Sequence, residues 1–185
     1  MNKQGKIIIA LLVVGLALFI SVQFIIIPKQ NAVAEQYELD QRNPLTHDLE
    51  NILKYKHPYM GSAGNLTNLF RRLPMTEAIK DFELLSDDLT LIVNYHLPID
   101  TIGTKTVNQS LIYNSTAAFS LIGNLEKIHY NFSDKSFVIH RESVESLYDD
   151  FGKLTSSNEI WNQQVRNPLG DAAYTKNSLN KILEN

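Results

Sequence analysis

The five histidines have the clearest potential for chemistry, because imidazole binds metals and transfers protons near neutral pH. They are His47, His57, His96, His129 and His140. None has the H-E-x-x-H spacing of a zinc protease. The strand pattern described below places His129 and His140 side by side on the polar face of a hairpin, where they could share a metal with a third ligand. Because no third ligand accompanies them, we interpret both as solvent-facing strand residues and expect no metal and no cofactor.

The chain lacks the sequence features of nucleophilic catalysis. It contains no cysteine, and no serine stands in a G-x-S-x-G motif. Two pairs of adjacent carboxylates, Asp87-Asp88 and Asp149-Asp150, fall at an expected turn and at an expected helix end, where aspartate serves local structure. We therefore expect no catalytic residue and no enzymatic activity, and an envelope hydrolase or transferase is kept only as an alternative.

A glycine-containing loop before a helix offers a second type of site. Gly61-Ser62-Ala63-Gly64 precedes Asn65, which we expect to cap a helix over residues 66–73. Backbone N–H groups at a helix start can bind an anion, and Arg71 and Arg72 could assist. The alternative is an ordinary loop with solvated arginines, which we favour because most such helix starts bind nothing. A small-ligand or anion receptor is therefore the alternative function at this place.

The segment just before this loop concentrates aromatic side chains around a proline. Tyr55, Pro58, Tyr59 and Met60 follow one another closely. Such a surface could contact a protein partner. Tyrosine also often buries its ring and leaves its hydroxyl free, so the same residues could pack the first helix against the sheet. The sequence favours this packing interpretation, and a Tyr59→Ala variant separates the two.

The elements that must position these residues follow from the hydrophobic periodicity. Amphipathic helices are expected near residues 47–53, 66–73, 107–122 and 142–151. Between them, two runs alternate apolar and polar residues as strands do, and turns at Asp87-Asp88 and Asp134-Lys135 make each run a hairpin. We predict an α+β fold of helix-hairpin-helix-hairpin-helix order, with an antiparallel sheet and helices packed on one face. Ile128, Tyr130, Phe132, Phe137 and Ile139 are expected on that face.

An uncharged apolar stretch near the N-terminus, residues 7–27, predicts where the protein resides. Its 21 residues would rise about 30 Å as a helix, which is the thickness of a bilayer's hydrocarbon core. Lys3 and Lys6 precede it and predict a cytoplasmic N-terminus, with the rest of the chain outside. Ala32-Val33-Ala34 has the form of a signal-peptidase site, so secretion after cleavage behind Ala34 is the alternative. We favour the uncleaved anchor because secretory apolar regions are shorter.

The charge balance outside this stretch argues against polyanionic partners. Residues 28–185 contain 15 Lys or Arg and 20 Asp or Glu residues, a net charge of −5. A nucleic-acid-binding surface requires the opposite sign, so no nucleic acid is expected. An exported domain without cysteine fits a Gram-positive bacterium better than an animal secretory pathway.

Several short motifs in a fixed order resemble a known family. It is an uncharacterised domain-of-unknown-function family of Bacillus-type Firmicutes, which follows one N-terminal membrane segment or signal. The resemblance covers about residues 50–152 and rests on Lys54-Tyr55, Pro58-Tyr59, Gly61, Leu73-Pro74, Asn94-Tyr95 and the run FSLIGN at residues 119–124. It implies a place on the outer side of the cell envelope. It implies no activity and no catalytic residue.

Together these observations predict four segments: a cytoplasmic start and transmembrane anchor at residues 1–27, a stalk at 28–46, an α+β extracytoplasmic domain at 47–152 and a C-terminal helical extension at 153–185. Trp161 of the extension is expected to dock on the core. The predicted function is a membrane-anchored protein-interaction or sensory module, with the bilayer and an envelope protein as partners. The residues expected to contact a partner or ligand are Tyr55, Pro58, Tyr59, Gly61, Asn65 and Arg71.

Overall fold

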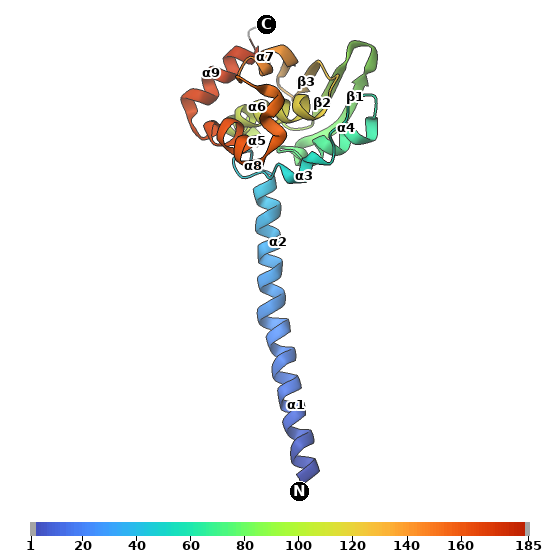
Figure 1. Cartoon of the computed structure of the whole chain (residues 1–185), viewed down its shortest axis with the longest axis vertical. Helices are drawn as coiled ribbons and strands as arrows, with labels where there is room; N and C mark the ends of the chain where they lie inside the picture. The colour runs from blue at the N-terminus through green and yellow to red at the C-terminus, as the bar shows by residue number, and fades with distance from the viewer. Residues whose placement is uncertain (1–2, 184–185) are drawn as a thin grey trace. The chain divides into compact units, whose positions relative to one another are not determined.

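The computed structural model describes residues 3–183 and divides the chain into two compact units, residues 1–39 and residues 40–185 (Figure 1). The first unit is helical: α1 (Lys3–Ser21), a π-helical turn η1 (Val22–Ile26) and the start of α2 (Ile27–Gln41). The widened turn lies directly before Pro28, which has no N–H to donate to the preceding turn of helix.

The apolar part of this helix has the dimensions of a membrane span. By length and composition, Leu11–Gln41 is the one helix among residues 3–183 that could cross a bilayer, and an 18-residue stretch of it has a mean hydropathy of 2.6. None of that apolar stretch is buried inside the protein, and Phe24 is 74% exposed. Exposed apolar surfaces of this size are typical of segments that contact a membrane or another protein. Both an uncleaved anchor and a signal sequence have these properties, and Ala34 lies within α2.

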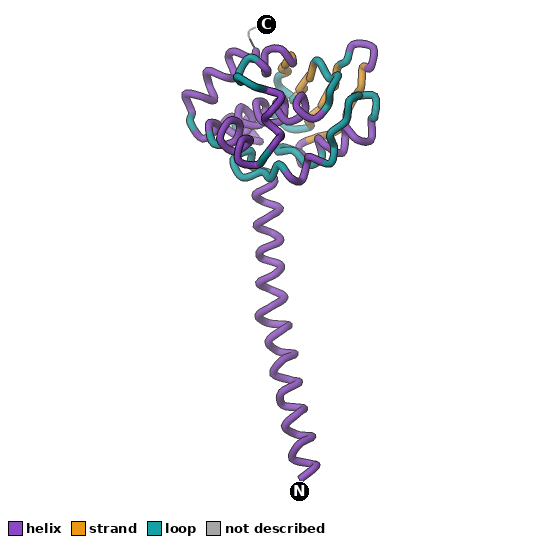
Figure 2. Tube along the Cα trace, in the orientation of Figure 1, coloured by secondary structure: helices purple, strands orange, loops and turns teal. Residues whose placement is uncertain are grey.

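The second unit contains a four-stranded sheet in the order β1-β2-β3-β4, from β1 (Ile79–Leu85), β2 (Thr90–Tyr95), β3 (Lys127–Asn131) and β4 (Ser136–His140) (Figures 1 and 2). The two hairpins, β1–β2 and β3–β4, are antiparallel, whereas β2 and β3 are parallel. The fold is therefore α+β as predicted, but the expectation of a purely antiparallel sheet is wrong. The reason is that α6 (Thr104–Leu121) carries the chain back before β3 begins, and such a crossover makes adjacent strands parallel.

One face of the sheet carries the core. Phe82 pairs with Val93, Val93 with Tyr130, and Tyr130 with Phe137, so apolar residues from all four strands share this face. The five residues expected here from the second hairpin are buried, which confirms that prediction: Ile128, Tyr130, Phe132, Phe137 and Ile139. The opposite face is polar, and Asn94 joins Asp81 and Asn131 in a ladder of side-chain hydrogen bonds of 2.6 and 3.0 Å.

Helix α6 lies in the interior and is covered on more than one side. Nearly every residue from Val107 to Leu121 is buried, including hydroxyl and amide side chains. The sequence predicted an amphipathic helix here, with one buried face. Its other side is covered by helices of the C-terminal segment, which the local pattern of α6 cannot indicate. That segment contributes four residues to the core: Trp161, Val165, Leu169 and Ile182. Trp161 therefore docks on the core, as expected.

Most of the other helices are short. The helix expected over 142–151 ends at Glu145, because the hydroxyl of Ser146 bonds back to the carbonyl of Ser143 (2.6 Å) and the chain then turns. The remaining helical elements are α3 (Glu50–Leu53), α4 (Ala63–Phe70), η2 (Thr76–Ala78), η3 (Ser86–Asp88), α5 (Ile99–Ile102), α7 (Arg141–Glu145), η4 (Phe151–Ser156), α8 (Asn158–Trp161), η5 (Asn162–Arg166), η6 (Pro168–Gly170) and α9 (Ala172–Leu183).

A buried chain of hydrogen bonds joins the start of this unit to α6 and α8. The indole N–H of Trp161 donates to the hydroxyl oxygen of Tyr113 (3.0 Å), and that hydroxyl contacts Nδ1 of His47 (2.8 Å). Nε2 of His47 lies 2.8 Å from the carbonyl of Arg72, which can only accept. Nε2 therefore carries the proton, and Tyr113 donates to Nδ1. Burial lowers the pKa of His47 from its ordinary 6.5 to about 4, so the ring is neutral.

Candidate functional site: the Tyr59 loop

Residues 54–61, called the Tyr59 loop below, are fixed by backbone contacts with the segment that follows α6. The N–H of His57 donates to the carbonyl of Leu121 (2.8 Å), and the N–H of Gly123 donates to the carbonyl of His57 (2.9 Å). These bonds form an isolated parallel bridge between His57 and Ile122. The two sequence motifs, about 60 residues apart, are therefore bound directly to each other.

Two neighbouring residues, Gly123 and Asn124, hold the two backbone segments close together. A Cβ atom placed on Gly123 would lie 2.9 Å from the carbonyl oxygen of Pro58 and 3.2 Å from its Cα, so only glycine allows the two backbones to approach this closely. The side-chain oxygen of Asn124 accepts the N–H of Met60 at 2.6 Å. Met60 itself is 1% exposed. The glycine and the asparagine of the FSLIGN motif thus both hold the Tyr59 loop.

Arg141, at the start of α7, supports the same segment from its other side. Its guanidinium donates to the carbonyls of Phe119 (3.0 Å), Ile122 (2.6 Å) and Leu125 (2.7 Å). It also lies 5.2 Å from the ring centre of Phe119. The carbonyl of Phe119 belongs to the last turn of α6, where helical partners are missing, and the carbonyls of Ile122 and Leu125 lie in the segment that follows. Sequence analysis missed Arg141, because nothing near position 141 indicates a partner about 20 residues away.

Tyr59 projects from this fixed loop into solvent. Its side chain is 64% exposed, whereas every other tyrosine of residues 40–183 is buried or half-buried. The ring of His57 stands edge-on to it at 6.2 Å, and Nδ1 of His57 lies 2.7 Å from the carbonyl oxygen of Tyr59. Pro58 and Gly61 are exposed on either side. The loop therefore exposes the ring of Tyr59 to solvent on a backbone that hydrogen bonds fix in place.

Tyr55 and Asn65 have a different role in the same region. Tyr55 is half-buried and packs against the core, and its carbonyl accepts a bond of 2.6 Å from the side chain of Asn65. Asn65 was expected to cap the helix, but α4 begins at Ala63 after Ser62, so Asn65 lies inside the helix and its side chain is free to reach Tyr55. Tyr55 and Met60 make the packing contacts of the loop, whereas Pro58 and Tyr59 form its exposed surface.

Arg71 is not brought to the glycine-containing loop. It is the C-terminal cap of α4, whereas Gly61 and Ser62 precede the N-terminus of that helix. Eight residues of helix separate the two ends by about 12 Å. The suggested anion site therefore has its arginine at the wrong end of the helix.

The two histidines considered as metal ligands lie on the polar face of the sheet. His129 pairs with Val138 and His140 pairs with Lys127, so the two imidazoles are diagonal neighbours. Partial burial, with Lys127 and His140 nearby, lowers the pKa of His129. Within residues 3–183, no group of three or more His, Cys, Asp or Glu side chains is placed to hold a metal.

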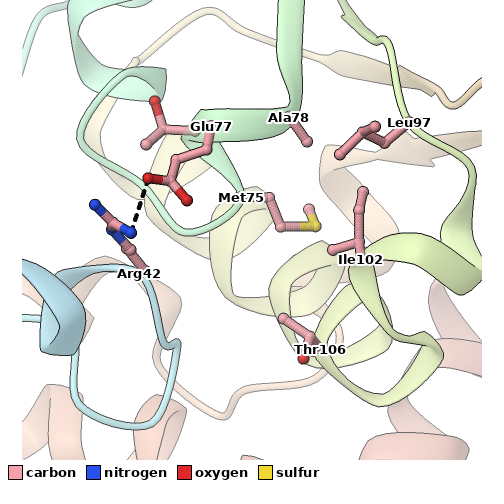
Figure 3. A pocket seen from close by; sticks show the side chains of 8 residues that line it. Arg42, Met75, Glu77, Ala78, Leu97, Ile102 and Thr106 are labelled. Atoms are coloured by element: carbon pink, nitrogen blue, oxygen red, sulfur yellow. Dashed lines mark ion pairs between the residues drawn. The ribbon is translucent and has the colours of Figure 1, made fainter.

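A small pocket of about 260 Å³ lies between the turn before β1 and the start of α6 (Figure 3). Met75, Ala78, Leu97 and Ile102 form its apolar part, and an ion pair of 2.8 Å between Arg42 and Glu77 stands at its edge. Met75 has a left-handed backbone (φ 66°), which is uncommon for a residue with a side chain. The pocket could hold a small apolar group, and sequence analysis gave no signal for it.

The comparisons with known proteins identify the domain that carries the loop. A family model described as a domain of unknown function (DUF4825) matches residues 52–143. No curated protein and no solved structure matches the chain. The matched range includes the Tyr59 loop, the FSLIGN motif and Arg141, and excludes Trp161. Residues 52–143 of this chain therefore match the model of the DUF4825 family, and they follow an N-terminal helix that is apolar and long enough to cross a membrane.

Proposed function

We propose that this protein is a membrane-anchored protein-interaction module on the outer side of a bacterial cell envelope, and that the Tyr59 loop is its contact surface. The observation that carries the proposal is the 64% exposure of Tyr59 on a loop whose neighbours are bonded to residues 121–124. Tyrosine provides a large contact area with little rotamer entropy to lose, and it is common at the centres of protein interfaces. A fixed backbone further reduces the entropy lost on binding.

The packing interpretation of Tyr59 predicts a different result from the contact interpretation. If Tyr59 were an internal packing contact, Tyr59→Ala would unfold the domain. Because most of its ring is already in water, we expect this variant to change the free energy of unfolding by less than about 0.5 kcal/mol. Partner binding should fall strongly in the same variant.

Site-specific photocrosslinking in native membranes tests the proposal. p-Benzoylphenylalanine is introduced at position 59 of the full chain, and the matched control carries it at Val138, which is exposed on the polar face of the sheet. The proposal expects a discrete protein adduct from position 59 and none of the same mass from position 138. Absence of any protein adduct from position 59 would refute it.

Accessibility labelling tests the proposed membrane orientation. The chain contains no cysteine, so single cysteines can be introduced without background. Asn180→Cys, in an exposed turn of α9, should react with a membrane-impermeant maleimide in intact cells, whereas Gln4→Cys should react only after lysis. The reverse pattern would place the domain in the cytoplasm. Intact mass of the membrane-extracted chain distinguishes the uncleaved anchor from cleavage after Ala34.

A second candidate function is a small-ligand receptor, supported by the pocket beside Arg42. An apolar ligand with a carboxylate could place its chain among Met75, Leu97 and Ile102 and exchange with Glu77 for the guanidinium of Arg42. Calorimetry of the full chain with short-chain fatty acids, compared between wild type and Arg42→Ala, tests this function. Binding that is absent, or unchanged in the variant, would exclude it.

A further inference from the structure

The Tyr59 loop differs in charge from the domain that carries it. Residues 40–185 contain 14 Lys or Arg and 18 Asp or Glu residues, a net charge of −4. The loop itself contains Lys54 and Lys56 and no acidic residue. The most exposed aromatic ring of this unit therefore lies within five residues of two cations on an otherwise acidic domain.

Both lysines are available to a partner. Lys54 and Lys56 are exposed, and neither forms an ion pair with any residue that the structure describes. The ammonium of Lys54 lies over the ring of Tyr55, 5.2 Å from its centre, and this contact leaves the charge of Lys54 without a carboxylate partner. Arg141 and Lys153 have carboxylate partners, whereas other exposed cations of the unit, such as Arg71 and Lys105, form no ion pair among the described residues. The two loop lysines differ from those cations in lying within five residues of the exposed ring of Tyr59. No described carboxylate of this unit thus neutralises the positive charge of the two loop lysines.

We infer that the partner of the Tyr59 loop presents an acidic segment, in which Asp or Glu side chains meet Lys54 and Lys56 and an adjacent apolar group packs on the ring of Tyr59. This inference rests on the proposed function and names the chemistry of its partner. A pair of positive charges beside an exposed ring attracts such a segment to one place on a domain of negative net charge, so the charges favour one orientation of the complex.

The charge distribution favours an acidic protein segment over an anionic membrane surface. Two lysines near a bilayer contribute only about 1 kcal/mol each. A bilayer is a continuous negative plane, which would also face neighbouring parts of a domain of net charge −4. A short segment meets only the loop and avoids that repulsion.

A zero-length crosslink tests the inference in native membranes that contain the full chain. Carbodiimide joins a lysine amine to a carboxylate with loss of one water and leaves no spacer, so it reports direct contact. Mass spectrometry of the products should show amide bonds from Lys54 or Lys56 to an Asp or Glu of another protein. The double variant Lys54→Glu/Lys56→Glu should lower the photocrosslink yield from position 59 about tenfold. The double variant Lys54→Arg/Lys56→Arg should retain that yield.

A matched control separates local from overall charge. Lys105→Glu/Lys176→Glu makes the same change in net charge on α6 and α9 and should leave the yield from position 59 unchanged. If position 59 forms its protein adduct but the charge reversal at 54 and 56 leaves the yield unchanged, or lowers it no more than this control does, the acidic partner is refuted and the proposed function stands. If position 59 crosslinks only to lipid, or to nothing, both are refuted.

Discussion

The neutral state of buried His47 makes the stability of this domain depend on pH. The ring is 0% exposed, and its Nδ1 accepts the hydroxyl of Tyr113 at 2.8 Å. A proton on Nδ1 would remove that acceptor and place a charge in the core. In the unfolded chain, His47 should have the ordinary pKa of 6.5, against about 4 in the folded protein. Below pH 6.5 the unfolded chain therefore binds the extra proton, and the free energy of unfolding falls as the pH falls toward 4.

The size of the effect follows from these two pKa values. A single group with them lowers the free energy of unfolding by about 2 kcal/mol between about pH 7 and pH 5, and by about 3.4 kcal/mol once the pH is well below 4. His47→Gln removes this titration while keeping a polar side chain at the site. The variant should be less stable than wild type at pH 7, because a buried hydrogen bond is disturbed, but its stability should fall by about 2 kcal/mol less on acidification.

Denaturant unfolding followed by tryptophan fluorescence measures this difference. Trp161 is the only tryptophan in the chain, is buried, and donates to Tyr113 in the same hydrogen-bond chain. The full chain in detergent micelles is unfolded in urea at several pH values for wild type, His47→Gln and His96→Gln. The last variant is the matched control, because it makes the same substitution at an exposed histidine. Parallel curves for wild type and His47→Gln, within about 0.5 kcal/mol, would refute the neutral buried histidine.

Three further variants test how the Tyr59 loop is held, each measured by urea unfolding of the full chain. Gly123→Ala should cost about 1–3 kcal/mol, because its Cβ would stand 2.9 Å from the carbonyl oxygen of Pro58; a neutral result would contradict the close approach. Asn124→Ala should cost about 1–2 kcal/mol by leaving the N–H of Met60 without its acceptor, and Asn124→Asp, which keeps an acceptor, should cost less. Arg141→Lys should cost about 2–3 kcal/mol, because one ammonium cannot replace a guanidinium that bonds three carbonyls; equal stability would show that those bonds contribute nothing.

Local patterns predicted the elements of this fold better than their arrangement. The alternation of Ile128 and Tyr130 with polar residues correctly assigned the buried face of β3, because side-chain direction in a strand has a period of two. The helix over 142–151 was predicted too long, since its apolar spacing is equally satisfied by a short helix followed by turns against the core. The parallel pairing of β2 and β3 was missed because hairpin patterns do not state how hairpins are joined.

For the candidate site, too, the sequence predicted the residues involved but not how they are arranged. The sequence singled out Tyr55, Pro58 and Tyr59 by composition, and it could not say which of them faces solvent. The structure buries Met60, half-buries Tyr55 and exposes Tyr59. That outcome depends on bonds to residues 121–124 and on the support given by Arg141, and no local signal links these segments.

The sequence alone determined the apolar N-terminal helix, the α+β class and the polar and apolar faces of the strands. Each of these depends on the order of polar and apolar residues over a few helical turns or a few strand positions. The hydrophobic effect decides from that order alone which side of the element is buried. Only the tertiary structure decided that α6 is buried on several sides, that His47 is neutral and that Tyr59 is the exposed ring. Those properties depend on contacts between residues about 60 positions apart in sequence, and such contacts exist only after the chain has folded.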